Sequence, residues 1–252
     1  MALALIIVVV VLIGRATGDA KRAEQALNDL YGDAPTFVPS PDGSIDSERI
    51  EAFLRVRGRL SDYCVVFQDK FGILIRLNEL EQDGTASRAT VAREGIGGLK
   101  ELFKAGRLFL LFMEARNEAL LEEQMGLGEY IYIYALAYSE QLGQVADSPF
   151  AEIKQAYVGD RARNDLVQIL RNQLDLLAIL EDQPGQAELA AALRAQLAGL
   201  SAGEQRLPWE DGLPSAIAAS LEPYANNLAD SYCEGIAKVE LMQKNKGLNI
   251  KN

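Results

Sequence analysis

Acidic side chains with a regular spacing are the first candidates for chemistry in this chain. Glu114, Glu118 and Glu122 recur every four residues, and Glu129 follows shortly after them. A spacing of four places side chains on one face of an α-helix. Carboxylates gathered in this way could bind a cation or act as a general acid and base. Because like charges at this spacing repel each other, a solvated face attended by basic residues is the interpretation that the sequence favours.

The chain contains no histidine. This absence excludes Ser-His-Asp and Cys-His catalysis, and it removes imidazole as a metal ligand. We therefore predict neither a metal ion nor a cofactor. An enzymatic role, which the sequence does not favour, would be that of a carboxylate-dependent hydrolase acting on glycans of the cell envelope. Its acid would be one of Glu114, Glu118, Glu122 and Glu129.

A run of tyrosines follows the acidic residues. The alternation of Tyr and Ile over residues 130–134 fits a strand, whereas Tyr130, Tyr134 and Tyr138 would share one face of a helix. The flanking Ala-Leu-Ala favours the helix. A stripe of tyrosines bears hydroxyls that need partners, so it suits a partner-binding groove. The alternative is core packing with the hydroxyls at the rim.

The only tryptophan, Trp209, lies between two prolines in the loop 203–214. An ordered loop of this kind often carries function, so we add Trp209 to the tyrosine stripe as a candidate partner surface. Its alternative role, which the sequence favours, is that of a hydrophobic plug over the end of a bundle.

Two cysteines, Cys64 and Cys233, both fall within helical patterns. In an oxidising compartment they could form a disulfide that closes a loop of roughly 170 residues, worth about 4–5 kcal/mol in the chain-entropy model. Two buried free thiols are the alternative. The sequence leaves both possibilities open.

The chain opens with an unbroken apolar run that ends at Gly14. The run is shorter than the roughly 20 residues of a transmembrane helix and resembles the core of a signal peptide. No basic residue precedes it, and Gly18-Asp19-Ala20 is a poor cleavage site. We therefore expect residues 1–18 to be an uncleaved signal-anchor segment that contacts the membrane through residues 2–14.

The orientation of this anchor is contested. Arg15, Lys21 and Arg22 follow the run, and positive residues favour the cytoplasmic side. A signal-like sequence instead favours export. We expect the domain to be extracytoplasmic, periplasmic in a bacterium, with the cytoplasmic face of the membrane as the alternative.

Composition limits the fold and its partners. The chain has 252 residues, of which 49% are hydrophobic, and this is enough for a packed core. Its formal net charge of -11 argues against nucleic acid as a partner, because binding to phosphates needs clustered Lys and Arg.

Apolar periodicity predicts successive helices without convincing strands. Residues 19–46 read as a short helix and a Pro-rich linker, and residues 47–252 as an elongated, mostly antiparallel helical bundle, with sub-bundles 47–145 and 146–252 as the alternative. We expect helices over the following ranges: 47–81, a block ending near 124 and interrupted at 95–98, 160–181, a segment around 189–197, and 215–242.

These observations favour an all-α, membrane-tethered binding or scaffold protein of the cell envelope, with a possible protein partner. The alternatives are the carboxylate-dependent hydrolase and a cytoplasm-facing membrane adaptor.

Overall fold

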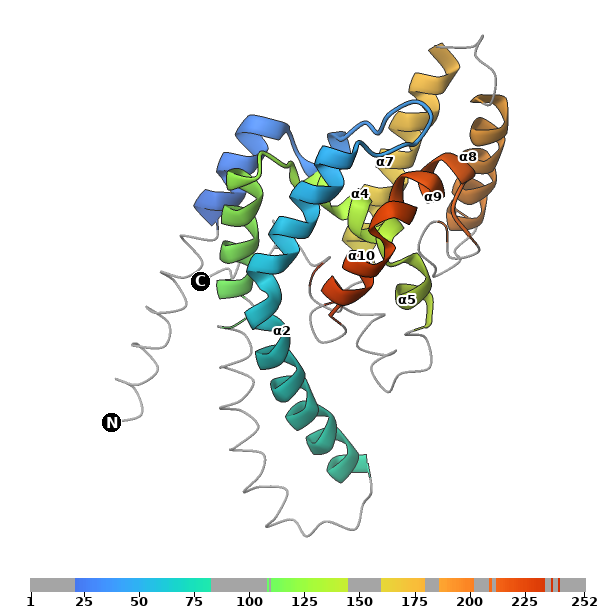
Figure 1. Cartoon of the computed structure of the whole chain (residues 1–252). Coiled ribbons are helices and arrows are strands. Elements are labelled where there is room, and N and C mark those ends of the chain that lie inside the picture. Colours follow the sequence, from blue (N-terminus) through green and yellow to red (C-terminus); the bar gives the residue numbers. More distant parts are fainter. Residues whose placement is uncertain are drawn as a thin grey trace, which may run out of the picture. The chain divides into compact units, whose positions relative to one another are not determined.

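The computed structural model describes residues 21–82, 108, 110–144, 160–179, 186–201, 209, 212–233, 237 and 240 (Figure 1). All regular elements in these ranges are helices, so the prediction of an all-α fold is confirmed for the part of the chain described. The apolar run at 1–18 and the glycine-rich interruption at 95–98 lie outside the described residues. Within the described ranges, no helix combines the length and apolarity of a membrane span.

The chain divides into two compact units, each assembled from segments that are distant in sequence. Unit 1 comprises residues 1–32, 51–127 and 233–236, and unit 2 comprises residues 33–50, 128–232 and 237–252. The sub-bundles 47–145 and 146–252 stay a prediction.

Unit 1 is organised by the long helix α2 (Ser47–Gln82), whose bounds agree with the predicted 47–81. Phe53, Leu60 and Phe67 recur every seven residues and are all buried. Tyr63 and Phe67 pack edge-on against Phe112 in the helical segment 110–122, with ring centroids 5.8 Å apart in both pairs. The spacing of seven residues thus identifies the face of α2 that packs in the core of this unit.

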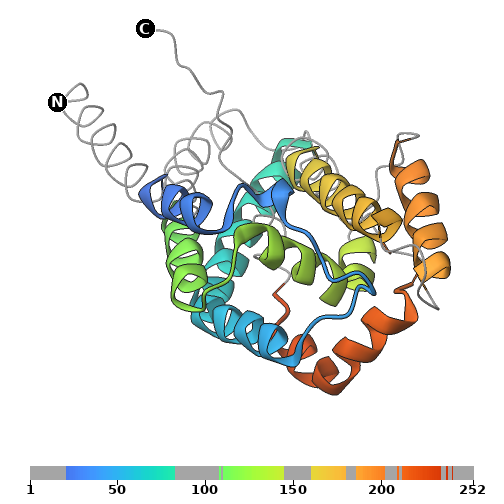
Figure 2. The same cartoon turned by 90° about the horizontal axis from the view of Figure 1, so that it is seen from above.

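Unit 2 contains short helices, shown from above in Figure 2. They are η1 (Ala34–Thr36), α4 (Leu127–Ala137), α5 (Ser139–Gln144), α7 (Asp160–Ile179), α8 (Gln186–Ser201), α9 (Ser215–Leu221), η3 (Glu222–Tyr224) and α10 (Ala225–Ser231). α7 packs against α8 and against η1. Leu189, Leu193 and Leu197, which recur every four residues on α8, are buried.

The Pro-rich segment 33–46 is packed within unit 2 and is not a free linker. The side-chain amide of Asn172 on α7 donates to the carbonyls of Pro35 and Phe37, at 2.9 and 3.1 Å. Gln173 donates to the carbonyl of Ser40 at 3.1 Å. Gly43 has φ +76°, and a Cβ there would lie 3.0 Å from Ile217. Side chains of α7 thus satisfy carbonyls of this partly exposed segment and hold it against the helix.

The single final helix predicted over 215–242 is wrong. α9 ends at Leu221, a 3-10 turn containing Pro223 follows, and α10 ends at Ser231. Proline has no N–H to donate, which interrupts the α-helical bonding pattern. Tyr232 is extended, with φ -68° and ψ 138°, so Cys233 follows the last turn of α10 and does not flank a continuous stripe.

Candidate functional site

Glu129, one of the candidate acids, is held in an ion pair within unit 2. Its two carboxylate oxygens accept from Nε and Nη2 of Arg49, each at 2.6 Å. Such a two-point pair fixes the carboxylate and satisfies both of its oxygens. The geometry is that of a structural contact between the start of α2 and the start of α4.

The other candidate acids belong to unit 1 and lie at or near its surface. Glu122 is exposed and pairs with Arg59 of α2, while its neighbour Glu123 accepts from Arg55 at 2.7 Å. Glu118 is exposed and Glu114 half-buried. Both of these basic partners, Arg55 and Arg59, come from α2.

Glu114 and Glu118 do influence one titratable neighbour, Tyr63. Burial raises the pKa of its phenol, and the two negative charges raise it further. Its hydroxyl contacts the carbonyl of Leu111 at 3.4 Å. This arrangement keeps the phenol neutral and does not assemble an acid and a base around a bound substrate.

The tyrosine stripe forms the interior of unit 2. Tyr130, Tyr134 and Tyr138 on α4 each have 0% of their surface exposed. Successive rings lie 6.1 and 4.9 Å apart between centroids. The predicted partner surface at these residues is therefore replaced by core packing, the alternative, because the whole face of α4 that bears them is covered.

Two of the buried tyrosines form hydrogen bonds with residues in the C-terminal part of the chain. The hydroxyl of Tyr130 donates to the buried carboxylate of Glu240, and that of Tyr138 lies 2.7 Å from Oγ of Ser231. The ring of Tyr232 lies 5.0 Å from that of Tyr138. Hydroxyl partners of this kind are what a buried tyrosine requires. These contacts hold Ser231, Tyr232 and Glu240 in unit 2.

Tyr132 points to another face of α4, toward the Pro-rich segment. Its ring contacts Phe37 at 5.8 Å between centroids. Burial raises the pKa of its phenol; the amide of Gln173 lowers it and the charge of Asp42 raises it. Sequence analysis counted Tyr132 only within the alternation and gave it no role.

Trp209 is buried, with 3% of its surface exposed, which is the burial expected of a plug. It has a positive φ of 66°, uncommon for a bulky residue, and its backbone N–H donates to Oε1 of Gln196 on α8 at 3.2 Å. The side chain is therefore part of the interior and not an exposed anchor for a partner.

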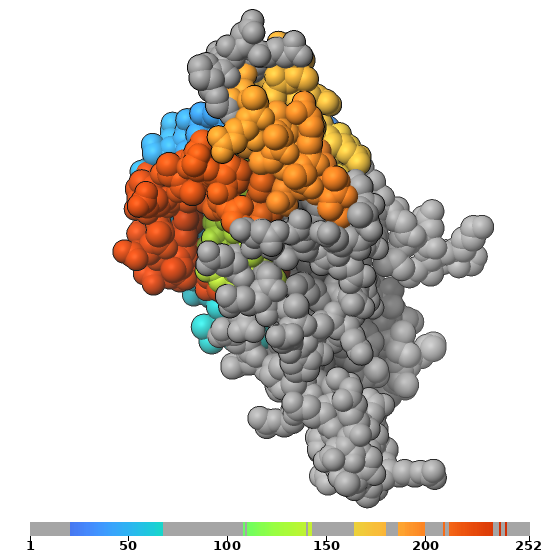
Figure 3. All heavy atoms as spheres, turned by 90° about the vertical axis from the view of Figure 1, so that its right-hand side faces the viewer, coloured from blue at the N-terminus to red at the C-terminus, as the bar shows by residue number. Residues whose placement is uncertain are grey.

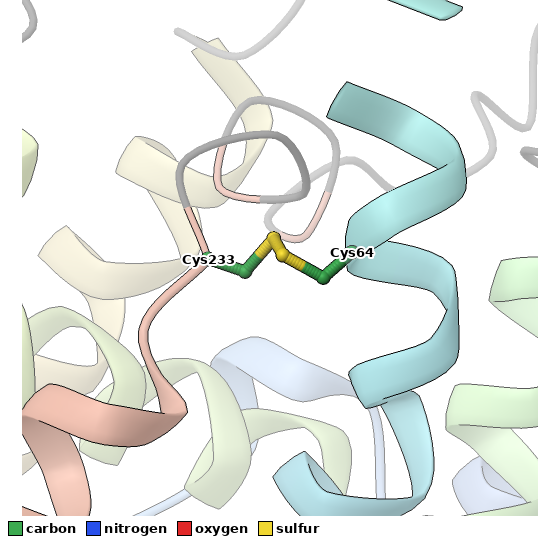
Figure 4. Close-up of a disulfide and its surroundings, with 2 residues drawn as sticks. All are labelled: Cys64 and Cys233. Carbon is green, nitrogen blue, oxygen red and sulfur yellow. A yellow bond between two sulfur atoms is a disulfide. The ribbon is translucent and has the colours of Figure 1, made fainter. Parts of the chain in front are cut away.

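A disulfide joins Cys64 of α2 to Cys233 within unit 1. Figure 4 shows the two side chains pointing toward each other, and their Cα atoms are 5.8 Å apart. This separation is typical of disulfides. The bond connects residues 169 positions apart, so it ties Cys233 to the long helix α2.

The candidate site that remains is a pocket of about 460 Å³ in unit 2. It lies between the junction of α4 and α5 and the segment that carries α9, η3 and α10. Figure 3 shows part of the green α4–α5 segment beside the red atoms of α9 and α10. Its lining residues are Leu136, Ala137, Ser139, Gln141, Gly212, Leu213, Ala218, Leu221, Glu222, Ala225, Leu228 and Ala229.

This pocket has no signature in the sequence, because its leucines and alanines are also the ordinary residues of helix packing. Its volume falls in the range of small-molecule sites, and apolar walls with a few polar groups are their usual lining. Ser139, which is buried, and the exposed Glu222 supply polar groups. The arrangement can bind a compact ligand but offers no paired acid and base.

The described residues contain no group of three or more Asp, Glu or Cys side chains arranged to hold a metal ion. No protein-family model, curated protein or solved structure matches the chain. The case for a function therefore depends on the geometry of the chain itself.

Proposed function

We propose that this chain is a membrane-tethered, extracytoplasmic binding or scaffold protein of the cell envelope. In this proposal residues 2–14 are the tether, and the helices form an elongated, mostly antiparallel bundle behind it. The ligand occupies the pocket between α4–α5 and α9–α10, and the buried tyrosines support the wall of that pocket.

The observation that carries this proposal is the disulfide between Cys64 and Cys233. Disulfides form and persist in oxidising compartments and are rare where thiols are kept reduced. A disulfide behind an apolar leader therefore favours export over the cytoplasm-facing alternative.

The contacts of the carboxylates favour binding over hydrolysis. Glu129 has both oxygens paired with Arg49, and Glu122 pairs with Arg59 at the surface. Glycoside cleavage needs two carboxyl groups that flank the scissile bond, whereas each of these carboxylates is held by an arginine side chain.

Protease accessibility in native cells, combined with deletion of residues 2–14, tests the proposal. We expect the full chain to sediment with membranes and to be cut by protease added to intact cells. The deletion variant should be released from membranes. A control with the apolar residues of the run reordered should stay attached, because apolar burial does not depend on their order. Cleavage only after permeabilisation would contradict the export of the domain.

A further inference from the structure

The only charge among the lining residues of the pocket is negative. These lining residues come from two stretches of sequence, residues 136–141 and 212–229, and neither stretch contains a Lys or an Arg. Glu222 is the only charged lining residue, and it is exposed. The remaining lining is apolar apart from the side chains of Ser139 and Gln141.

The shape of the site restricts the size of its ligand. A pocket of about 460 Å³ lies within the range that holds one small molecule, not a long helix. Four alanines, at positions 137, 218, 225 and 229, form much of the lining. Small side chains leave room for an apolar group between the helices, with the carboxylate of Glu222 within the same site.

We propose that this pocket binds a small organic cation: an apolar ring or short chain that bears one ammonium group. The apolar part fills the space between α4–α5 and α9–α10 and is removed from water. The ammonium group is placed near Glu222, in a site whose lining contains no competing basic side chain. This inference names the ligand class of the proposed binding pocket and therefore rests on the proposed function.

Calorimetric titration of the full chain in nanodiscs of zwitterionic lipid tests the inference, with empty nanodiscs as the blank. The probes share one apolar body and differ in charge: phenylpropyl-trimethylammonium, phenylpropanol and phenylpropanesulfonate. We expect the cation to bind most tightly and the anion most weakly. The advantage of the cation should shrink as salt is added, because salt screens exposed charges.

Two variants locate the site. Glu222→Gln should weaken cation binding about three- to fivefold, the worth of one exposed ion pair, and leave phenylpropanol unchanged. Glu188→Gln, a matched change of an exposed carboxylate on α8 outside the pocket, should alter neither. Ala225→Phe, which adds a ring to the lining, should weaken both the cation and the alcohol about tenfold.

The outcomes separate this inference from the proposed function. Equal binding of all three probes, or tighter binding of the sulfonate, would overturn the cation preference and leave a binding pocket in place. If no probe binds, both the ligand class and the binding function assigned to this pocket fail. Weaker cation binding in Glu222→Gln but not in Glu188→Gln supports the inference even where Ala225→Phe does not fold.

Discussion

At the scale of single residues, Tyr132 links stability to pH. Because its pKa in the folded protein lies above the ordinary value of 10.0, the phenol stays protonated at a pH where the unfolded chain ionises. Its contribution to stability is fully present below pH 10 and is lost as the pH rises through the folded pKa. We expect the free energy of unfolding to fall above pH 10, by about 1.4 kcal/mol per pH unit for one phenol.

The variant Tyr132→Phe isolates this effect. Above pH 10, the free energy of unfolding of this variant should fall less steeply with pH, by about 1.4 kcal/mol per pH unit, because one phenol no longer titrates. This difference in slope does not depend on how much the substitution changes stability at neutral pH. Urea denaturation from about pH 8 to about pH 12 measures both quantities. An unchanged slope would show that the phenol of Tyr132 is not the titrating group.

The pair of Arg49 and Glu129 gives a second prediction at this scale. Glu129→Gln should lower the free energy of unfolding by about 1–2 kcal/mol, because it leaves a partly buried guanidinium without its anionic partner. The matched change Glu118→Gln, at an exposed position, should alter stability by no more than about 0.5 kcal/mol. Denaturant titration of the three proteins makes the comparison, and equal effects of the two changes would contradict a structural role for Glu129.

At the scale of elements, the approach of α4 to η1 depends on Gly128. A Cβ at this position would collide with the carbonyl oxygen of Ala34 and lie 2.7 Å from Cβ of Phe37. Gly128→Ala should therefore destabilise the fold by about 2–3 kcal/mol. Gly58→Ala on α2 is the control: nothing lies within 4 Å of its added Cβ, so the helix should gain up to about 1 kcal/mol. If both variants changed the free energy of unfolding in the same direction, the close packing of η1 on α4 would be contradicted.

The elements that follow from periodicity are those the sequence predicts best. The bounds of α2 agree because its apolar residues repeat along a single helix, and α7 and α8 agree within a few residues. The division of the final helix at Pro223 was missed, although proline supplied a local signal. Packing of the segment 33–46 against Asn172 was not predictable, because the contact joins residues more than a hundred positions apart.

The site was harder to predict than the helices. A stripe of Tyr130, Tyr134 and Tyr138 has the same period whether its face is covered or open, so sequence alone cannot separate a core from a groove. The arginine partners of the carboxylates lie on α2 and become visible only in the folded chain. The pocket depends on the space left between alanines, for which no local pattern exists.

At the scale of the whole molecule, the disulfide constrains the unfolded chain. Because it closes a long loop, replacing Cys64 and Cys233 by serine should lower the free energy of unfolding by about 4–5 kcal/mol. A dithiol reductant should bring the wild-type protein to the same stability and leave the double variant unchanged. Thermal unfolding with and without reductant measures this effect. A wild-type unfolding midpoint that does not change on adding reductant would contradict the presence of the disulfide.

The oxidation state of Cys64 and Cys233 in cells tests the central claim, that the chain is a disulfide-bonded protein of an oxidising, extracytoplasmic compartment. Native cells are quenched in acid, and the protein is alkylated before and after reduction, then weighed intact by mass spectrometry. The account predicts that Cys64 and Cys233 take up alkylating reagent only after reduction. Uptake of two groups before reduction would show free thiols in the cell and contradict both the disulfide and the export of the domain.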